Sequence, residues 1–359
     1  MTRDKTRLLK VGDLSIGGGS PVSVQTMCNV DPHDASAISA QIDRCAALGC
    51  DLIRLTIPDL DAAKVLKIVK SSSPLPIVSD IHYDWRCALA AIDSGTDALR
   101  LNPGNIGSRD KVQSVARAAK EKRVPIRIGV NFGSLESDLD ARVRSGSIKP
   151  SEALVESALR HLAILEGEGF YDVAISAKAS NALETIATYR LLAGRTDCPL
   201  HVGVTEAGTF LPGTIRNSVA LGVLLSEGIG DTIRVSLTAE PEMEVRVGTE
   251  ILRSLGLKEP GPAITSCPTC GRTKIDLMRI ATEVENAMER FAAAHRGEKI
   301  PHVAVMGCAV NGLGEAKGAD IALCGGDGEC VIFVNGKFAA KVSESDAARK
   351  VMEYVDAVR

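Results

Sequence analysis

The feature that most constrains the fold is an alternation of short apolar runs and helical segments over about the first two thirds of the chain. Eight runs rich in β-branched residues are each followed by a segment with helical periodicity. Apolar strands next to amphipathic helices are typical of a parallel sheet that helices cover. Eight such units favour a closed (β/α)8 TIM barrel, an α/β fold, over an open sheet. The predicted strands are 22–27, 52–57, 76–81, 98–102, 125–130, 172–177, 200–204 and 232–237.

A second domain is predicted where this alternation ends. A helical pattern covers residues 273–295, and residues 344–358 predict a final helix. The strands expected between them are 303–306, 321–324, 331–334 and 339–342. We therefore predict two domains. They are residues 1–258, a substrate-binding barrel with an N-terminal hairpin, and residues 262–359, a smaller α+β domain.

The composition excludes several classes of partner. The net charge is −3, and one Trp, four Tyr and six Phe give bases few rings to stack on, so we expect no nucleic-acid binding. No apolar run approaches the roughly 18 residues of a membrane span, and the N-terminus lacks a signal sequence. We therefore expect a cytoplasmic protein with no membrane partner. Its ten cysteines should be reduced thiols or metal ligands.

Cationic side chains stand at or near the carboxyl ends of five predicted strands. In a barrel of this kind, those ends form the face that carries the chemistry. A single arginine in an apolar strand is usually structural. Five cations on one face instead predict a site for a small polyanion, because guanidinium groups bind phosphate oxygens in pairs. The five are Arg54, Arg100, Arg127, Lys178 and Arg234.

Other polar residues accompany these cations. His82 ends the third strand and is either a structural histidine or a substrate contact. Glu206 ends the seventh strand and either neutralises an arginine or donates a proton. Residues 133–149, in the longest connection, form either a mobile lid or a solvated surface loop. The remaining substrate contacts that we expect at strand ends are Asn102, Asn131 and Ser236.

The cysteines of the second domain indicate a metal site. Cys267-Pro-Thr-Cys270 places two thiols on one turn, and Cys308 follows a later apolar strand. Three such thiolates favour an iron–sulfur cluster, and Glu315 follows Cys308 by seven residues where no fourth cysteine is near. Inert thiols are one alternative. Another alternative is a barrel protein stabilised by a structural zinc ion, which binds a phosphorylated metabolite without redox chemistry. Its zinc ligands would be Cys267, Cys270, Cys324 and Cys330.

These residues lie in motifs that closely resemble those of the 4-hydroxy-3-methylbut-2-enyl diphosphate synthase family. The likeness covers nearly the whole chain, roughly residues 8–345, and fits the two-domain bacterial form. The motifs are Val24-Gln-Thr-Met27, Asp80-Ile-His82, Arg100-Leu-Asn-Pro-Gly-Asn105, Ile126 to Glu136, Thr205-Glu-Ala-Gly208, Leu225 to Leu237, Cys267-Pro-Thr-Cys270 and Gly307 to Glu315.

The resemblance implies an oxidoreductase of the methylerythritol phosphate route to isoprenoids and terpenoids. Its reaction would be reductive ring opening and dehydration of 2-C-methyl-D-erythritol 2,4-cyclodiphosphate to 4-hydroxy-3-methylbut-2-enyl diphosphate. Two single electrons would come from reduced flavodoxin or ferredoxin through one 4Fe–4S cluster per chain. The implied cluster ligands are Cys267, Cys270, Cys308 and Glu315.

The same resemblance assigns roles to barrel residues. The family's diphosphate site maps onto the five cations with Asn131 and Ser236, and its acid/base carboxylate onto Glu206. Family members are head-to-tail homodimers. Two residues depart from the family pattern: Cys28 stands where threonine is common, with no clear consequence, and Leu313 stands where proline is usual. The turn before Glu315 is therefore expected to be less preorganised, since proline would fix one φ.

Overall fold

The computed structural model describes residues 2–259, 261–262, 264–295, 298–308, 314 and 318–358. The chain divides into two compact units, Met1–Lys258 and Glu259–Arg359. Each unit has its own hydrophobic core. Within the described part, no helix has the length and apolar character that crossing a bilayer requires.

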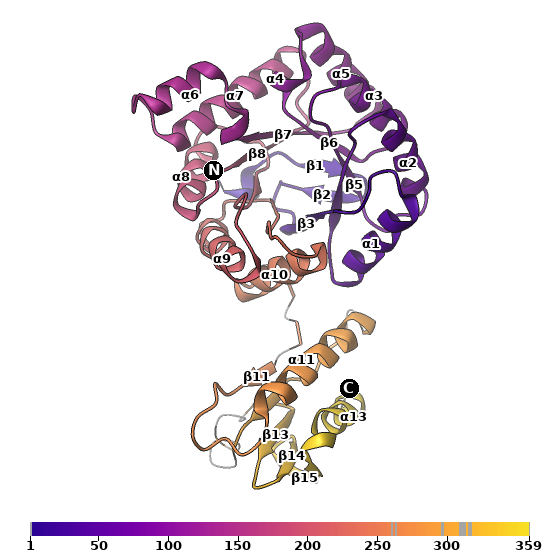
Figure 1. Ribbon diagram of the computed structural model, residues 1–359, viewed down its shortest axis with the longest axis vertical. Coiled ribbons are helices and arrows are strands. Elements are labelled where there is room, and N and C mark those ends of the chain that lie inside the picture. The colour runs from indigo at the N-terminus through magenta and orange to yellow at the C-terminus, as the bar shows by residue number, and fades with distance from the viewer. Residues whose placement is uncertain are drawn as a thin grey trace. The chain divides into compact units, whose positions relative to one another are not determined.

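The first unit is a barrel of parallel strands surrounded by helices, which confirms the predicted α/β class (Figure 1). The sheet order is β8-β7-β6-β5-β4-β3-β10-β9, and an isolated bridge between Ile175 and Leu200 joins its two ends. The strands are β3 (Ser23–Met27), β4 (Leu52–Thr56), β5 (Ile77–Asp80), β6 (Ala98–Leu101), β7 (Ile126–Asn131), β8 (Val173–Lys178), β9 (His201–Val202) and β10 (Thr232–Ile233). The main helices are α1 (Ala35–Ala47), α2 (Leu60–Lys70), α3 (Trp85–Asp93), α5 (Arg109–Lys122), α7 (Pro150–Gly167), α8 (Ala182–Ala193), α9 (Phe210–Ser226) and α10 (Pro241–Ser254).

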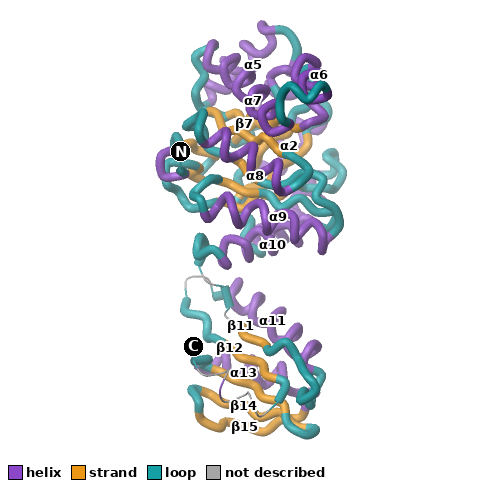
Figure 2. Tube along the Cα trace, turned by 90° about the vertical axis from the view of Figure 1, so that its left-hand side faces the viewer, coloured by secondary structure: helices purple, strands orange, loops and turns teal. Residues whose placement is uncertain are grey.

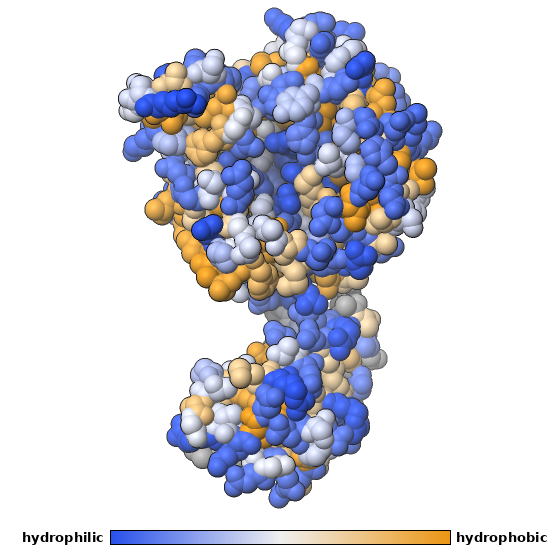
Figure 3. Space-filling model, viewed as in Figure 1, coloured by the Kyte–Doolittle hydropathy of each residue, from blue (hydrophilic) through white to orange (hydrophobic). Residues whose placement is uncertain are grey.

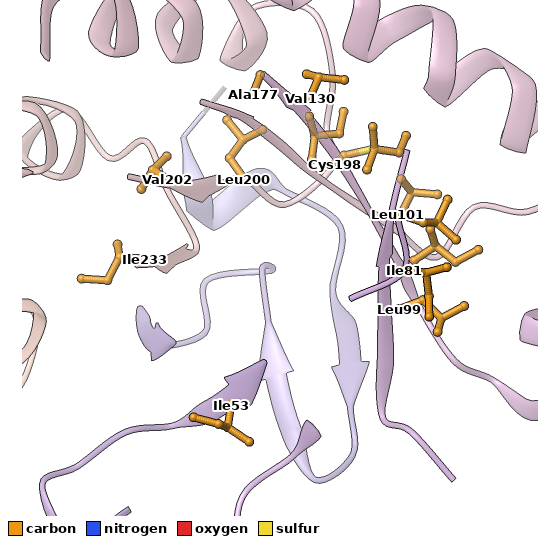
Figure 4. Packing of buried hydrophobic residues seen from close by; sticks show 14 of the residues in the cluster. Ile53, Ile81, Leu99, Leu101, Val130, Ala177, Cys198, Leu200, Val202 and Ile233 are labelled. Carbon is orange, nitrogen blue, oxygen red and sulfur yellow. The ribbon is translucent and has the colours of Figure 1, made fainter. Parts of the chain in front are cut away.

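Side chains alternate between the two faces of each strand, and this alternation places the cations inside the barrel. Ile53 and Leu99 belong to the large core between the strands and the helices, part of which is drawn in Figure 4. Arg54 and Arg100 follow directly after them and therefore project to the opposite face, toward the barrel axis. The inward direction of the partly buried arginine in each of these strands is thus a consequence of the strand period.

An N-terminal hairpin closes the amino end of the barrel. It consists of β1 (Leu9–Val11) and β2 (Leu14–Ile16), which pair antiparallel after a short 3₁₀ helix at Arg3–Lys5. Val11 and Ile16 pack with Leu52 and Ala98, the first residues of β4 and β6. The open end of the barrel is therefore the carboxyl end, as expected for a barrel that carries a site.

Two parts of the barrel differ from the sequence prediction. Segment 133–149 contains helix α6 (Ser137–Arg144), anchored by the fully buried Leu139, which both loop interpretations missed. Strands β9 and β10 have only two residues each, because side chains accept hydrogen bonds from backbone groups that follow them. Asn217 Oδ1 accepts from Val204 N at 3.1 Å, and Glu244 Oε1 accepts from Leu237 N at 3.0 Å.

Within its described residues, the second unit is a five-stranded sheet with two helices on one face (Figure 2). Strands β11, β12 and β13 run parallel, and β14 and β15 continue the sheet antiparallel. Ile280 and Val284 of the first helix pack with Val351 and Val355 of the second. The sequence did not predict β11. The elements are β11 (Ile264–Ser266), α11 (Leu277–Ala294), β12 (Val303–Met306), β13 (Ile321–Gly325), β14 (Glu329–Val334), β15 (Lys337–Ser343), a 3₁₀ helix at Glu344–Asp346, and α13 (Ala347–Val358).

Candidate functional site

Five cationic side chains meet inside the barrel near the carboxyl ends of its strands. Arg54, Arg100 and Arg127 lie on β4, β6 and β7, Lys178 ends β8, and Arg234 follows β10. Burial, with the charges of Arg234, Arg54 and Arg127, holds the pKa of Lys178 well below its usual value. The structure thus brings together the ring of cations that the sequence predicts. Figure 3 shows a hollow lined by hydrophilic residues at the centre of the barrel face turned to the viewer.

Asp80, the last residue of β5, is the counterion of two of these arginines. Its carboxylate is 1% exposed and lies 3.5 Å from Arg54 Nε and 3.2 Å from Arg100 Nη1. His82 Nε2 lies 3.8 Å from the same carboxylate. Burial alone would raise the pKa of Asp80, but Arg54 and Arg100 outweigh it and hold that pKa below its usual value. Asp80 is therefore ionised at neutral pH.

Glu244 of α10 is the counterion of Arg234. Its two oxygens accept hydrogen bonds from Arg234 Nε at 3.0 Å and Nη2 at 3.1 Å, a bidentate pair that fixes the plane of the guanidinium. The same buried carboxylate accepts from Thr26 Oγ1 at 2.7 Å and from Leu237 N at 3.0 Å. Glu244 therefore ties β3 and the segment after β10 to helix α10, and it sets the direction in which Arg234 meets a ligand.

Sequence reasoning assigned no role to these two carboxylates. Asp80 ends a fully buried strand, and Glu244 lies on the buried side of an amphipathic helix beside Val245 and Gly248. A carboxylate at such a position is costly unless it is paired, so each position was itself a signal for a buried cation. The signal identifies a paired charge but does not identify the partner.

Below the counterions lies a buried polar layer that the sequence analysis also missed. Gln25 Oε1 accepts from Arg127 Nη1 at 2.7 Å. Burial, followed by the charges of Arg127 and Lys178, holds the pKa of His201 well below its usual value, so this histidine is neutral. Within the described residues, Arg127 Nε and Nη2, Gln25 Nε2 and His201 Nε2 have no hydrogen-bond partner. A buried donor without a hydrogen-bond partner costs free energy. An oxygen-rich ligand or water that binds against this layer would supply the missing partners.

Two glycines give the long cations their space. A Cβ added to Gly129 would lie 2.1 Å from Arg100 Nε, and one added to Gly203 would lie 3.1 Å from Lys178 Nζ. Arg100 crosses Gly129 to donate to its carbonyl oxygen at 3.2 Å. Gly129 is thus required by the close approach of a side chain, whereas a Cβ at Gly203 would first meet the backbone carbonyl oxygen of Arg234, at 2.2 Å.

The other predicted substrate contacts differ in how exposed they are. His82 is half exposed beside Asp80. Asn102 is buried, and its Oδ1 accepts from Gly104 N at 3.0 Å, where it caps the short helix α4 (Pro103–Ile106). Asn131 and Ser236 are half-buried at their strand ends.

Glu206 lies in the loop between β9 and α9, at the open end of the barrel. It is exposed, and among the described residues it forms no ion pair. The interpretation that Glu206 neutralises an arginine therefore finds no support, since Asp80 and Glu244 fill that role. Its backbone is left-handed, with φ 51°, a conformation that is uncommon for a residue with a side chain.

In the second unit, Cys267 and Cys308 lie beyond the carboxyl ends of two neighbouring parallel strands. Cys267 follows β11, and Cys308 lies two residues beyond β12. Gly307 N donates to Cys267 Sγ at 3.3 Å. Lys274 N donates to Gly307 O at 3.0 Å, so the turn that follows Cys270 packs against the strand end that carries Cys308.

The chemistry of these thiols fits an iron–sulfur cluster. N–H groups of Arg272 lower the pKa of Cys270, and a backbone N–H donated to sulfur is a known means of tuning clusters. In the described ranges, no three metal-binding side chains surround one point closely enough for a single ion. A cubane cluster sets a different requirement, because each ligand binds a different iron. The predicted fourth ligand, Glu315, lies outside the described residues, as does Leu313.

The four-cysteine zinc site is wrong. Cys324 lies on one face of the second sheet with Met306 and Ala322. Cys330 lies on the other face, in the core beneath α11 and α13. One ion cannot contact both faces of a sheet, and burial raises the pKa of each thiol to about 11, which disfavours the thiolate that zinc binds.

Comparisons with known proteins agree with both units. A family model described as the GcpE TIM-barrel domain matches residues 6–249, and one described as the GcpE protein C-terminal domain matches residues 263–357. The 4-hydroxy-3-methylbut-2-en-1-yl diphosphate synthase (flavodoxin) of Maridesulfovibrio salexigens is 54% identical, over 95% of this chain and 93% of that enzyme. Enzymes of the same name from Geobacter sulfurreducens and Clostridium acetobutylicum are 50% and 51% identical, each over 99% of this chain and over 98% and 99% of their own lengths. The chain belongs to the GcpE family.

Proposed function

We propose that this protein is a 4-hydroxy-3-methylbut-2-en-1-yl diphosphate synthase of isoprenoid biosynthesis. Its substrate is 2-C-methyl-D-erythritol 2,4-cyclodiphosphate. In the reaction, a ring C–O bond and a neighbouring C–OH bond break, a C=C bond forms, two electrons enter, and a proton converts the leaving hydroxyl to water. The observation that carries the proposal is the convergence of five cations inside the barrel of a chain that matches enzymes of this name over nearly its full length.

The cations bind the diphosphate and orient the ring. Arg54, Arg100 and Arg234 are held in fixed directions by buried carboxylates, so little side-chain freedom is lost when the ligand arrives. Arg127 offers two unpartnered donors, and Lys178 Nζ has no hydrogen-bond partner among the described residues. We assign the remaining polar contacts to His82, Asn102, Asn131 and Ser236.

Glu206 is the proposed acid/base group. It lies at the open end of the barrel and is free of any described ion pair, so its carboxyl group can take and give a proton. Glu206→Gln should therefore lower kcat by about 10²- to 10⁴-fold and leave KM nearly unchanged. Equal losses in substrate binding would assign Glu206 to the diphosphate site instead.

A 4Fe–4S cluster is the proposed cofactor, one per chain, and when bound it supplies the two electrons singly. Cys267, Cys270 and Cys308 would hold it, with Glu315 as the fourth ligand. Reduced flavodoxin, which the names of the relatives specify, or ferredoxin is the proposed donor. We place the enzyme in the cytoplasm, because all ten cysteines are free thiols and thiols persist in reducing compartments.

We further propose a head-to-tail homodimer in which one chain's cluster serves its partner's barrel. Mixing Glu206→Gln chains with Cys308→Ser chains tests this directly. A shared site gives hybrid dimers with one intact barrel and one intact cluster, so activity should reappear on mixing. If the mixture stays as inactive as its components, each chain works alone.

The proposed function is tested by anaerobic purification, metal analysis and turnover. Four iron and four sulfide per chain are expected. We also expect the protein to convert the cyclodiphosphate when reduced flavodoxin supplies the electrons. Arg127→Ala should weaken substrate binding while the cluster spectrum stays intact. A colourless protein with stoichiometric zinc, or an iron-loaded protein that leaves the substrate unchanged, would overturn the proposal.

A further inference from the structure

Glu206 occupies a backbone conformation that its surroundings must enforce. Its φ of 51° lies in the left-handed region, which residues other than glycine, asparagine and aspartate rarely adopt. Such a conformation persists when neighbouring contacts over-determine it, and it is found most often at functional sites. The contacts of the flanking residues therefore show what holds this carboxylate.

Two backbone hydrogen bonds fix the loop on either side of Glu206. Thr205 N donates to Ala179 O, just beyond β8, at 3.0 Å. Thr238 N, beyond β10, donates to Gly208 O at 2.9 Å. The loop is thus anchored to both neighbouring strand ends, and the residue between the anchors must make the turn.

Two side chains of α9 complete the frame. Arg216 Nη1 donates to Ala207 O at 2.7 Å. The next residue, Asn217, is fully buried; its Oδ1 accepts from Val204 N at 3.1 Å and its Nδ2 donates to Gly213 O at 2.9 Å. Val204, two residues before Glu206, and Ala207, the residue after it, are therefore held by side chains of α9.

We propose that Arg216 and Asn217 are positioning residues that hold Glu206 in its left-handed conformation at the rim of the barrel. The proposal rests on the proposed function, in which Glu206 moves the proton. Among the described residues, Arg216 forms no ion pair, and its guanidinium donates to the backbone carbonyl of Ala207, beside Glu206. Neither residue touches the ring of cations, so both act on the reaction through Glu206.

Arg216 gives the cleaner test, because it is largely exposed and its removal leaves the core intact. Arg216→Met removes the hydrogen bond to Ala207 O and should lower kcat about tenfold, with KM changed less than about twofold, since small misplacements of catalytic groups are costly. Arg216→Lys, which can still donate to that carbonyl, should recover most of the loss. Arg190→Met, on the neighbouring helix α8 and paired with Glu227, is the matched control and should leave kcat unchanged.

A double-mutant cycle separates positioning from other roles. If Arg216 acts through Glu206, Arg216→Met should cause no further loss of kcat in a Glu206→Gln chain. An unchanged kcat in the single variant, or the same tenfold loss in the Glu206→Gln background, would overturn the inference.

A stability measurement tests the same frame without turnover, so the inference can fail or hold apart from the proposed function. Asparagine adopts the left-handed region more readily than glutamate, so Glu206→Asn should raise the melting temperature of the barrel. The rise should shrink in an Arg216→Met chain, where the loop can relax. An equal rise in both backgrounds would show that Arg216 does not hold this conformation.

Discussion

Replacing Asp80 by asparagine should destabilise the barrel strongly while it improves the binding of simple polyanions. Asn keeps the size of the side chain but removes the charge that lies 3.5 Å from Arg54 and 3.2 Å from Arg100. The two guanidinium groups would then face each other and Arg127 without a counterion. Because Asn fills the same space, the substitution measures the free-energy cost of crowded cations without the added cost of a cavity.

The magnitude follows from the burial of the pair. Breaking a buried ion pair by removing one partner costs about 3 to 5 kcal/mol, because an uncompensated charge remains. Arg54 is not fully enclosed, so we expect a loss of about 3 kcal/mol in the free energy of unfolding at pH 7. An exposed pair gives the contrast: Asp61→Asn, which removes the surface contact with Lys64, should cost no more than about 0.5 kcal/mol.

Urea unfolding followed by tryptophan fluorescence measures this quantity. The chain has one tryptophan, Trp85, at the start of α3, so the signal reports on the barrel and not on the second unit. Inorganic pyrophosphate should restore part of the lost stability, and at equal concentration it should stabilise Asp80→Asn more than the parent chain, because a ligand that binds more tightly stabilises the folded state more.

The pH dependence of the stability difference tests the same reasoning. The pKa of Asp80 is lowered on folding, so its contribution is present above its usual value of 3.8 and is lost only as pH falls through the lower, folded value. The difference between the parent and Asp80→Asn should therefore be constant from neutral pH down to about 5 and shrink below about 4. A loss under about 1 kcal/mol, or equal stabilisation of both chains by pyrophosphate, would refute the counterion reasoning.

Three further predictions concern other parts of the molecule. Lys178→Met should raise the melting temperature at pH 7 and weaken substrate binding. Folding lowers the pKa of Lys178, so the gain in stability should diminish as pH rises toward 10.5. Gly129→Ala should raise KM at least about tenfold, since its Cβ would displace Arg100, whereas Gly222→Ala in α9, where an added Cβ meets open space, is the steric control. Cys330→Ser should retain iron and absorbance, whereas the same change at Cys308 should lose both, as iron analysis will show.

Much of the barrel could be predicted because one physical rule fixes both its strands and its site. A strand has a period of two, so an arginine inside an apolar run has to face away from the helices and into the barrel. The site could therefore be predicted from three arginines inside apolar runs, Arg54, Arg100 and Arg127. In the second unit, β11 escaped prediction because its three residues are half-buried or exposed and carry no apolar pattern.

The partners of these cations could not be predicted in the same way. Glu244 meets Arg234 only because α10 packs on β3, the neighbour of β10, with a particular rotation, which no local pattern specifies. His201 and Gln25 point inward through the register of short strands, and β9 contributes only two residues to that register. Contacts that depend on the relative rotation of packed elements become visible only in three dimensions.

The internal counterions also bear on how fast product leaves. A pocket that held five cations and no carboxylate would bind a diphosphate product about as firmly as its substrate, and departure would then limit the turnover rate. Asp80 and Glu244 already pair with Arg54, Arg100 and Arg234 in the ligand-free structure, so a departing phosphate oxygen would leave a guanidinium that has a partner. We therefore expect the two carboxylates to shorten the residence time of product on the enzyme.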